Sequence, residues 1–220
     1  MTINISKYCK KILDFLGIKS LIKPIYLKIV PYTHYRMSKE VWDSQYSSKY
    51  WDGLKQIGQL SRYSVIVGYC NYFKEGGTIL DLGCGEGILQ GKLCYNNYLY
   101  YVGVDYSAEA ISKALNREDE KPRFVNADIS DYSPGRRFDF IIFNESLYYI
   151  EDPLRIVKRY MSLLEEGGLL IVSMLVTEKS NRLWKMIEQS YDIKDEVLVT
   201  NKLTDKSWVI KVLTNLDHND

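Results

Sequence analysis

The chain has 220 residues, of which 46% are hydrophobic and 26% are charged, a balance typical of one globular domain with a short appendage. This composition excludes a wholly disordered chain, a collagen-like repeat and a coiled coil. Its 29 basic and 28 acidic residues give a formal net charge of +1, so bulk charge does not draw the chain to nucleic acid.

Cysteine and histidine are too few and too scattered for a structural zinc site, and no metal is expected. The four cysteines form no Cys-x-x-Cys pair, and the only histidines are His34 and His218. So few cysteines in a chain of this size predict reduced thiols and a cytoplasmic location. The sequence holds no run of about 20 apolar residues, which predicts no membrane-spanning helix, and lysines near the N-terminus argue against a signal peptide.

Residues 1–37 form a first unit, a basic and amphipathic helical extension. Lysines alternate with leucines and isoleucines there, and Asp14 is the only acid. Such a segment either packs on the main domain or lies on an anionic membrane surface. We favour packing, and peripheral membrane contact through residues 1–30 is the alternative, because periodicity does not distinguish the two surfaces. Pro24 and Pro31 divide the segment, so it is not one long helix.

Residues 38–220 form the main domain, which opens with a helical cap or lid over residues 38–77. Apolar residues at helical spacing predict a helix over Ser61–Phe73. Gly76 and Gly77 are placed to stop this helix.

Residues 78–220 form an α/β core, in which short apolar runs alternate with helical segments. Strands are predicted at Ile79–Leu82, Tyr100–Val104, Phe124–Val125, Phe138–Phe143, Leu169–Met174, Ile193–Thr200 and Ser207–Leu213. Helices are predicted behind Gly87 to about Cys94, and over Ala108–Leu115, Pro153–Leu164 and 179–190. This alternation predicts a Rossmann-like, mostly parallel sheet of seven strands with helices on both faces and a C-terminal antiparallel hairpin.

A glycine-rich loop follows the first predicted strand. Its acid and its three alternating glycines are Asp81, Gly83, Gly85 and Gly87. Glycines let the backbone approach a ligand closely, and ligands of such sheets lie at the carboxyl ends of the strands where the strand order reverses. The dinucleotide fingerprint G-x-G-x-x-G is not matched, because Ile88 stands at the third glycine position. A tight turn without a ligand is the alternative.

Polar residues also stand at the ends of the next three predicted strands. Asp105 ends the second strand, and its carboxylate can accept hydrogen bonds from both hydroxyls of a ribose. Its structural alternative is to cap the next helix, although Ser107 is the better placed cap. Asp128 follows the third strand, and Asn144 and Glu145 follow the fourth.

These patterns, in this order and over residues 78–175, resemble the class I S-adenosylmethionine-dependent methyltransferases. The resemblance implies that S-adenosylmethionine is bound and S-adenosylhomocysteine produced. It implies that Asp128 accepts a hydrogen bond from the adenine amino group, that Asn144 and Glu145 line the methionine part, and that backbone N–H groups near Gly83 meet the cofactor's carboxylate. The residues that it assigns to the cofactor are Asp81, Gly83, Cys84, Gly85, Gly87, Asp105, Tyr106, Asp128, Ile129, Asn144 and Glu145.

Three residues ahead of the first strand are further cofactor candidates. Arg62 is placed to grip a carboxylate with two parallel hydrogen bonds, and an exposed surface arginine is the alternative. In related enzymes an N-terminal segment closes over the cofactor, which makes Tyr46 and Trp51 candidates for a lid. Ordinary packing is the alternative for both aromatic residues.

The stretch that follows the fourth strand is the best candidate to face the methyl acceptor. Glu145 is a candidate base if apolar surroundings raise its pKa, and Tyr148 and Tyr149 are candidates to position a hydroxyl. The alternative is that Glu145 only holds the cofactor and the tyrosines pack. Many relatives have histidine at one of these tyrosines, and its loss weakens a histidine-base mechanism. His34 reaches the site only if the N-terminal segment folds over it.

The expected function is methylation of a sugar hydroxyl in surface polysaccharide or glycan biosynthesis, by analogy with bacterial stand-alone enzymes that the pattern resembles. The Glu-x-Leu-Tyr-Tyr run at Glu145 also resembles the nodulation-factor N-methyltransferases, so methylation of an amino sugar or another small metabolite is the alternative. Residues around Trp51 and Tyr148 would form the acceptor cleft. A non-catalytic cofactor-binding module is a second alternative, against which the intact glycines and acids argue. A nucleic-acid partner is not expected, because no Pro-Pro-aromatic motif follows Asn144.

Overall fold

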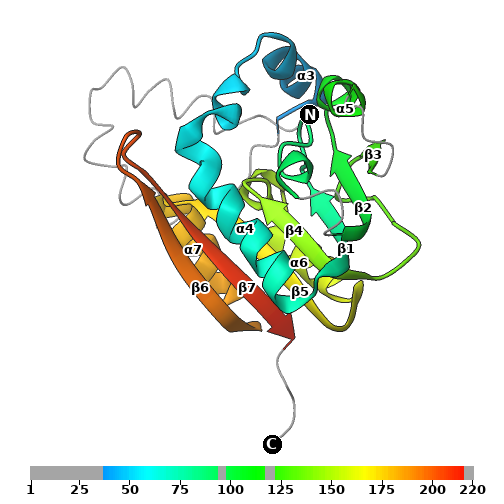
Figure 1. Cartoon of the computed structure of the whole chain (residues 1–220), viewed down its shortest axis with the longest axis vertical. Coiled ribbons are helices and arrows are strands. Elements are labelled where there is room, and N and C mark those ends of the chain that lie inside the picture. Colours follow the sequence, from blue (N-terminus) through cyan, green and yellow to red (C-terminus); the bar gives the residue numbers. More distant parts are fainter. Residues whose placement is uncertain (1–36, 94–97, 117–121, 216–220) are drawn as a thin grey trace, which may run out of the picture. The chain divides into compact units, whose positions relative to one another are not determined.

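Seven strands form one mixed sheet in the computed structural model, which describes residues 37–93, 98–116 and 122–215 (Figure 1). In chain order the strands are β1 (Gly76–Leu82), β2 (Tyr98–Asp105), β3 (Arg123–Asn126), β4 (Phe138–Asn144), β5 (Leu164–Leu175), β6 (Tyr191–Asn201) and β7 (Lys206–Asn215). Their order across the sheet is β3-β2-β1-β4-β5-β7-β6. Strands β1 to β5 are parallel, and β7 is antiparallel to both β5 and β6. The predicted fold class is confirmed.

The strand order reverses at β1, which pairs with β2 on one side and with β4 on the other. The register places Asp81 between Gly103 of β2 and Ile142 of β4. The carboxyl ends of these three strands therefore meet at one edge of the sheet, where α/β folds bind their ligands.

Helices cover both faces of the sheet, as predicted. They are α3 (Lys39–Ser47), α4 (Leu60–Phe73), α5 (Ala108–Leu115), α6 (Pro153–Met161) and α7 (Glu178–Ile187). One buried cluster joins α4 to the sheet through Tyr63 and Ile66, and a second joins α6 and α7 to the opposite face through Tyr160 and Leu183. Figure 1 shows α4 on one side of the strands and α6 and α7 on the other.

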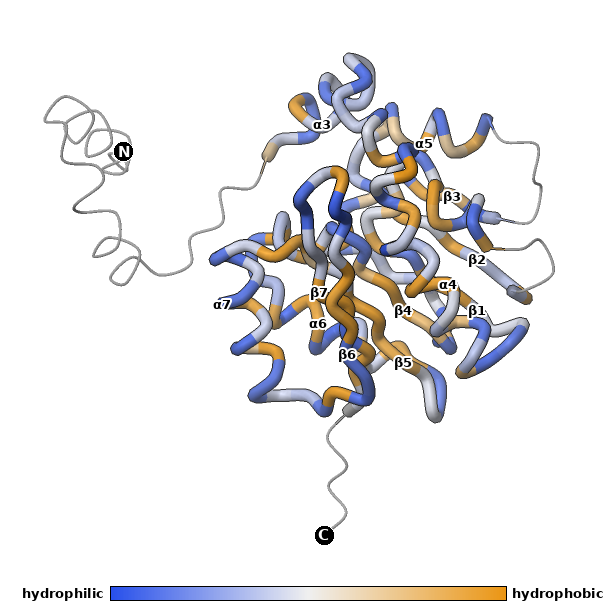
Figure 2. The backbone as a smooth tube through the Cα atoms, turned by 60° about the vertical axis from the view of Figure 1, so that its left-hand side comes forward, coloured by the Kyte–Doolittle hydropathy of each residue, from blue (hydrophilic) through white to orange (hydrophobic). Residues whose placement is uncertain are grey.

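Local signals explain where the helices begin. The Ser107 hydroxyl accepts a hydrogen bond from the Ala110 N–H and caps α5, and the Asp152 carboxylate caps α6 ahead of Pro153. The central strands are largely apolar, because helices cover both of their faces (Figure 2). Phe138–Phe143 is buried at every position.

The helix predicted behind the glycine loop does not form in the described residues 83–93. These residues make a series of turns and then one 3-10 turn, Gln90–Lys92. The reason is that Gly87 has a φ of +69° and Leu93 is already extended, with a ψ of 130°. Too few residues remain between them for a stable α-helix. Gly76 is also not a helix stop, because α4 ends at Phe73 and Gly76 is the first residue of β1.

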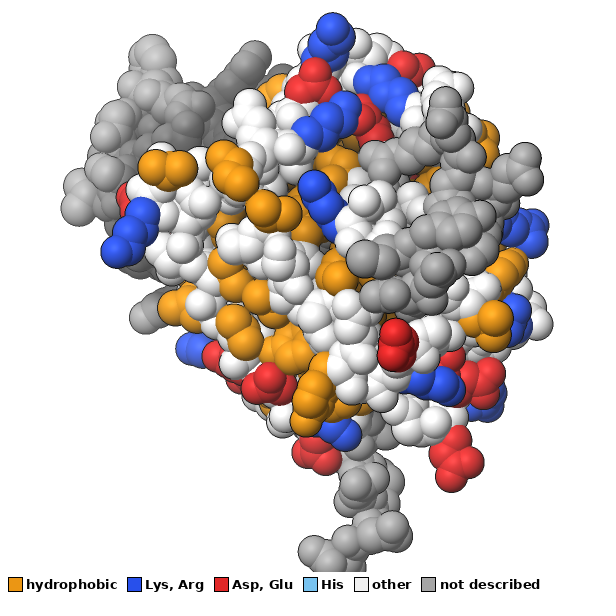
Figure 3. All heavy atoms as spheres, viewed as in Figure 1, with side chains coloured by type: hydrophobic (Ala, Val, Ile, Leu, Met, Phe, Trp, Pro, Cys, Tyr) orange, Lys and Arg blue, Asp and Glu red, His pale blue; other side chains and the backbone are white. Residues whose placement is uncertain are grey.

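The chain divides by its contacts into Met1–Tyr35 and Arg36–Asp220, and the described residues all belong to the second unit. The predicted extension over residues 1–37 lies outside the described residues except for Met37, so its role stays a prediction. Within the described ranges, no helix has the length and apolar character needed to cross a membrane. On the face drawn in Figure 3, acidic and basic side chains are interspersed.

Candidate functional site

A pocket lies at the carboxyl ends of β1, β2 and β4, beneath α3 and the segment that follows it. Its lining includes every predicted cofactor and catalytic residue except Gly87. A Cβ on Gly87 would lie 2.8 Å from the Phe124 ring. The predicted residues that line the pocket are Tyr46, Trp51, Arg62, Asp81, Gly83, Cys84, Gly85, Asp105, Tyr106, Asp128, Ile129, Asn144, Glu145, Tyr148 and Tyr149. Segments that are far apart in the sequence therefore meet around one space.

The glycine loop leaves no room for side chains. Gly83 and Gly85 have φ values of +83° and +55°, in the left-handed region that favours glycine. A Cβ on Gly83 would overlap the Ser146 side chain, and one on Gly85 would lie 2.8 Å from the Tyr46 hydroxyl. The loop therefore presents bare backbone to the pocket.

The N–H groups of Gly83, Cys84 and Gly85 donate to acceptors within the protein, and their predicted contact with the cofactor's carboxylate stays a prediction. Gly83 and Cys84 donate to the Val104 carbonyl at 2.7 and 3.1 Å, and Gly85 donates to the Asp105 carboxylate at 2.9 Å. These bonds hold the loop on β2.

Substituting Gly83 by alanine is expected to lower the free energy of unfolding by about 1–3 kcal/mol or more, because the methyl group overpacks against Ser146 at a strained φ. Urea denaturation measures the loss. Gly68→Ala is the matched control, since Gly68 is exposed within α4 and nothing lies within 4 Å of its Cβ position. The free energy of unfolding of this control should rise by up to about 1 kcal/mol, because alanine has a higher helix propensity than glycine. Equal stability of both variants would contradict the packing argument.

Asp105 lies at the end of β2, and its side chain is 8% exposed. One carboxylate oxygen accepts the Gly85 N–H and the other accepts the Ser107 N–H, both at 2.9 Å. Each oxygen keeps a second lone pair for a ligand. Burial raises the pKa of Asp105 to about 6, and the two backbone hydrogen bonds act in the opposite direction.

Helix α3 is tied to this edge of the site through Asp43. Its carboxylate accepts a hydrogen bond from the Ser107 hydroxyl at 2.5 Å and from the Glu109 N–H at 3.3 Å. Lys113 of α5 donates to the Tyr46 carbonyl at 2.6 Å. The segment that covers the pocket is thus connected to the residues that hold Asp105.

Arg62 is 1% exposed, which excludes the alternative of a surface arginine. Its guanidinium donates to the side-chain oxygens of Asn144 and Gln59, the latter at 3.0 Å, and lies 4.4 Å from the centre of the Tyr63 ring. Its Nε is buried and has no acceptor within the described part of the chain. Arg62 therefore joins α4 to the end of β4 and lines the pocket.

Asp81 is buried at the end of β1, with one oxygen engaged and one left over. Its Oδ2 accepts the Tyr101 hydroxyl at 2.6 Å, and its Oδ1 has no donor among the described residues. Burial raises the pKa of Asp81 to about 7; the nearby Asp105 raises it further, while the hydrogen bond from Tyr101 and the charge of Arg62 oppose this rise.

Asp81→Asn is expected to make the protein without cofactor more stable at pH 8 by up to about 4 kcal/mol. The folded state binds the Asp81 proton more tightly than the unfolded state, whose pKa is near 3.8, so this group's stabilisation is lost as the pH rises through about 7. Asparagine has no proton to release in this pH range, so the variant does not lose this stability as the pH rises. Thermal unfolding at pH 5 and pH 8 measures the difference. A variant less stable at pH 8 would show that ionised Asp81 and Arg62 stabilise each other by more than burial costs.

Glu145 follows β4 with a φ of +63°, a strained conformation for a residue with a side chain. Its backbone N–H donates to Ser173 of β5 at 3.0 Å. Its carboxylate accepts the Tyr148 hydroxyl at 2.9 Å and the Ser173 hydroxyl at 3.4 Å, and the Trp208 side chain also donates to it. Burial raises the pKa of Glu145, and the Arg62 charge and these donors oppose the rise.

Aromatic side chains form the cover and one side of the pocket. Trp42 stacks on Trp51 with ring centres 5.9 Å apart and meets the edge of Tyr149 at 5.0 Å. Tyr46 lies 6.3 Å from Trp51 and is buried over the glycine loop. Sequence reasoning missed Trp42, although its position four residues before Tyr46 places the two on one face of α3.

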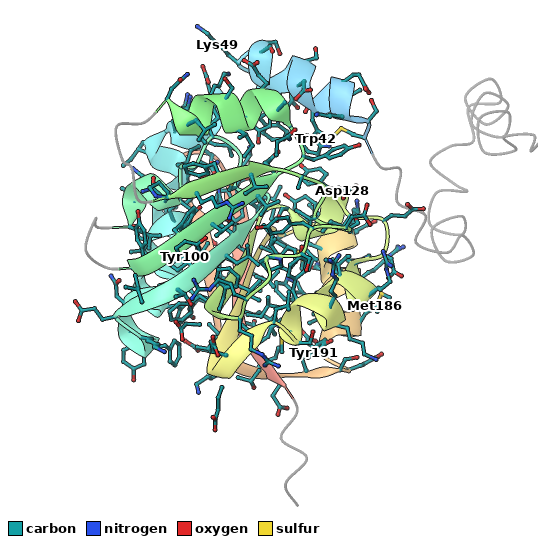
Figure 4. All side chains as sticks on the ribbon, turned by 90° about the vertical axis from the view of Figure 1, so that its right-hand side faces the viewer. Trp42, Lys49, Tyr100, Asp128, Met186 and Tyr191 are labelled. Carbon is teal, nitrogen blue, oxygen red and sulfur yellow. The ribbon has the colours of Figure 1, made fainter. Side chains whose placement is uncertain are left out.

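The far end of the pocket lies at the loop after β3. Asp128 accepts the Ser130 N–H at 2.9 Å, and Ile129 is 9% exposed. Figure 4 shows Asp128 at the same end of the molecule as Trp42 beneath α3. In the described ranges, no group of three or more histidine, cysteine or acidic side chains is arranged to hold a metal ion.

Comparison with known proteins decides the family. A family model described as a methyltransferase domain matches residues 59–195. The chain belongs to this family of methyltransferase domains. The match covers the pocket residues from Arg62 to Tyr149, and it confirms the predicted resemblance to methyltransferases.

Curated relatives share only part of their length with this chain. The ubiquinone biosynthesis O-methyltransferase of Coxiella burnetii is 29% identical over 121 residues, which are 53% of this chain and 51% of the relative. The enzyme of that name from Bradyrhizobium diazoefficiens is 28% identical over 160 residues, 64% of this chain and 61% of the relative. The chain thus spans about half to three fifths of the length of these relatives.

Solved structures of methyltransferases share the fold. The N-methyltransferase NodS from Bradyrhizobium japonicum, in complex with S-adenosylhomocysteine, has a TM-score of 0.65 at 19% identity, over 76% of this chain and 92% of NodS. The magnesium protoporphyrin IX methyltransferase from Synechocystis, with bound S-adenosylmethionine, has a TM-score of 0.65 at 16% identity, over 83% of this chain and all of that chain. The methyltransferase fold is confirmed, and S-adenosylmethionine as the cofactor agrees with it.

Proposed function

We propose that this chain transfers a methyl group from S-adenosylmethionine to a hydroxyl of a small-molecule acceptor, and that the acceptor is a sugar of a surface polysaccharide or other glycan. The proposal rests on one observation. Where the strand order reverses, the glycine loop at Gly83 and Gly85 lies beside the carboxylate of Asp105, which accepts the Gly85 N–H. The residues that match the methyltransferase domain, 59–195, include all of these positions.

The residues present fit the cofactor. The free lone pairs of Asp105 suit two ribose hydroxyls, and Asp128 and Ile129 suit the adenine. The unpartnered Arg62 Nε and Asp81 Oδ1 offer one donor and one acceptor where they are buried, which suits the carboxylate and ammonium of an amino-acid end. The glycine loop, which lines the same pocket, brings bare backbone close to these groups.

When bound, S-adenosylmethionine supplies an electrophilic methyl group on a cationic sulfur. The protein's part is to align the acceptor, exclude water and receive a proton. Trp42, Trp51 and Tyr46 cover the pocket and exclude water. Glu145 receives the acceptor's hydroxyl proton on its carboxylate, and the Tyr148 hydroxyl holds that carboxylate in place at 2.9 Å.

An amine acceptor is the second candidate, and Glu145 favours it. Proton transfer to a carboxylate is less uphill from a protonated amine, with a pKa near 10 in lysine, than from an aliphatic hydroxyl. Burial raises the pKa of Glu145, which reduces the difference between the pKa of the acceptor and that of the base. An amino sugar satisfies both candidates, because it carries hydroxyl and amino groups on one ring.

The test combines binding with product analysis. Titration calorimetry should show S-adenosylmethionine and S-adenosylhomocysteine binding one site. Incubation with methyl-deuterated S-adenosylmethionine and a pool of bacterial glycans should then yield a labelled glycan, in which NMR separates O-methyl from N-methyl. Binding without any methylated product would favour a non-catalytic module, and binding of a nicotinamide nucleotide instead would overturn the proposal.

A further inference from the structure

Three aromatic side chains from separate segments form one wall of the pocket, which we call the aromatic wall. They are Trp42 of α3, Trp51 at the start of the 3-10 turn Asp52–Lys55, and Tyr149 of the 3-10 turn Leu147–Tyr149. The Trp42 ring stacks on Trp51 with an interplanar angle of 24° and meets Tyr149 edge-on at 89°. The wall thus offers flat apolar surface to a ligand.

The aromatic wall lies beside the groups that face the acceptor. Tyr149 follows Tyr148, with ring centres 4.6 Å apart, and the Tyr148 hydroxyl donates to Glu145. The cofactor's ribose and adenine groups are instead assigned to Asp105 and Asp128 on β2 and after β3. The wall therefore continues the acceptor side of the pocket.

The indole N–H of Trp51 is a buried donor that none of the described residues accepts. Buried polar groups of native proteins are nearly always paired, so this donor calls for a partner. Trp184 of α7 also has an unpartnered indole N–H, but it packs in the core against Lys211 and not in the pocket. Of these two indoles, only that of Trp51 belongs to a residue that lines the pocket, and we infer that an oxygen atom of a ligand there is its partner.

Charge around the pocket selects against acidic ligands. Its described lining carries five carboxyl side chains and one cationic side chain, Arg62. Glu86 is paired with Lys55 and Lys113 at 2.5 and 3.1 Å, and the other four carboxyl groups are those of Asp81, Asp105, Asp128 and Glu145. Arg62 already donates to Asn144 and Gln59. An acceptor with a phosphate, sulfate or carboxylate would be desolvated near these carboxylates without a free cation to pair it, which is costly.

We propose that Trp42, Trp51 and Tyr149 form the acceptor subsite, that it binds a sugar ring without acidic groups, and that the Trp51 N–H donates to an oxygen of that ring. One face of a sugar ring consists of C–H groups and fits a flat aromatic surface, while the ring's rim carries oxygen atoms that accept hydrogen bonds. This inference rests on the proposed function, because it names the acceptor class of the same site.

The experiment measures glycan binding separately from cofactor binding. The full chain, saturated with S-adenosylhomocysteine, is applied to a glycan array that carries neutral, amino, sulfated and sialylated sugars. The wild type should bind neutral or amino sugars and not the acidic ones. Trp51→Phe, which keeps a ring and removes the N–H, should weaken that binding at least tenfold while the Kd for S-adenosylhomocysteine changes less than twofold.

Two further variants keep the test decisive. Trp184→Phe removes the other unpartnered indole N–H outside the pocket and should bind glycans like the wild type. Trp42→Leu removes flat surface and should lose glycan binding even if Trp51→Phe folds poorly. A wild type that binds S-adenosylhomocysteine but no sugar, or only acidic sugars, overturns the subsite alone. Loss of S-adenosylhomocysteine affinity in Trp51→Phe also overturns it, whereas a wild type that fails to bind S-adenosylhomocysteine overturns the proposed function.

Discussion

Asp105→Ala should raise the Kd for S-adenosylmethionine by at least about 100-fold, because two hydrogen bonds from ribose hydroxyls to a charged acceptor are each worth about 1.5–3 kcal/mol. The substitution also removes the acceptor of the Gly85 and Ser107 N–H groups, so the bare loop is no longer fixed beside the ribose. Titration calorimetry with S-adenosylmethionine and S-adenosylhomocysteine measures the loss.

The pH dependence of binding provides an internal check. Burial raises the pKa of Asp105 to about 6, so lowering the pH below 6 protonates the carboxylate and should weaken wild-type binding. The Asp105→Ala variant should lose the part of this decline that is centred near pH 6 and keep the part due to Asp81, whose pKa is raised to about 7. Asp152→Ala is the control for stability. It removes the α6 cap, worth about 0.5–2 kcal/mol, and Asp152 is not among the residues that line the pocket. Wild-type affinity in Asp105→Ala would remove Asp105 from the ribose site.

Elements with strong local patterns could be predicted from the sequence. Helix α5 has the predicted bounds because Ser107 caps it. Strand β4 extends only one residue beyond the predicted Phe138–Phe143, because that stretch is apolar apart from Asp139. The candidate site was predictable for the same reason. Residues at the ends of successive parallel strands must converge on one edge of the sheet, as Asp81 and Asp105 do.

What the sequence did not reveal depends on contacts between distant segments. The N–H of Gly83 is consumed by Val104, a contact set by the pairing of β1 with β2. The burial of Arg62 depends on Asn144, which lies 82 residues further along the chain. No local pattern specifies either partner. The absence of a helix behind Gly87 could have been predicted from the sequence, because the glycines there disfavour a helix.

The hydrogen bonds around Asp105 connect cofactor binding to the cover of the pocket. The carboxylate of Asp105 accepts the Ser107 N–H, and the Ser107 hydroxyl donates to Asp43 of α3. Helix α3 carries Trp42 of the aromatic wall and Tyr46 over the glycine loop. Under the proposed function, a ribose bound at Asp105 would stabilise the segment that encloses the acceptor, and we therefore expect the cofactor to bind before the acceptor.

Glu145→Gln is expected to lower kcat by about 10²–10⁴-fold, the range for loss of a general base, with less than a threefold change in the Kd for S-adenosylmethionine. Glutamine keeps the shape of the side chain and can still accept the Tyr148 hydroxyl, but it takes no proton at neutral pH. Single-turnover rates together with calorimetry separate the two effects. Glu151→Gln, an exposed glutamate in the same loop, is the matched control and should retain wild-type rates.

The pH profile distinguishes a base from a residue that merely holds a ligand. Burial raises the pKa of Glu145 above its usual 4.5, so wild-type kcat should rise with pH as the carboxylate ionises and then level off. The rising limb should vanish in Glu145→Gln and should persist in Tyr148→Phe with its midpoint moved upward, because the hydrogen bond from Tyr148 stabilises the ionised form. Equal losses of kcat and cofactor affinity in Glu145→Gln would instead make Glu145 a cofactor-binding residue, and a hydroxyl acceptor would then lack its general base.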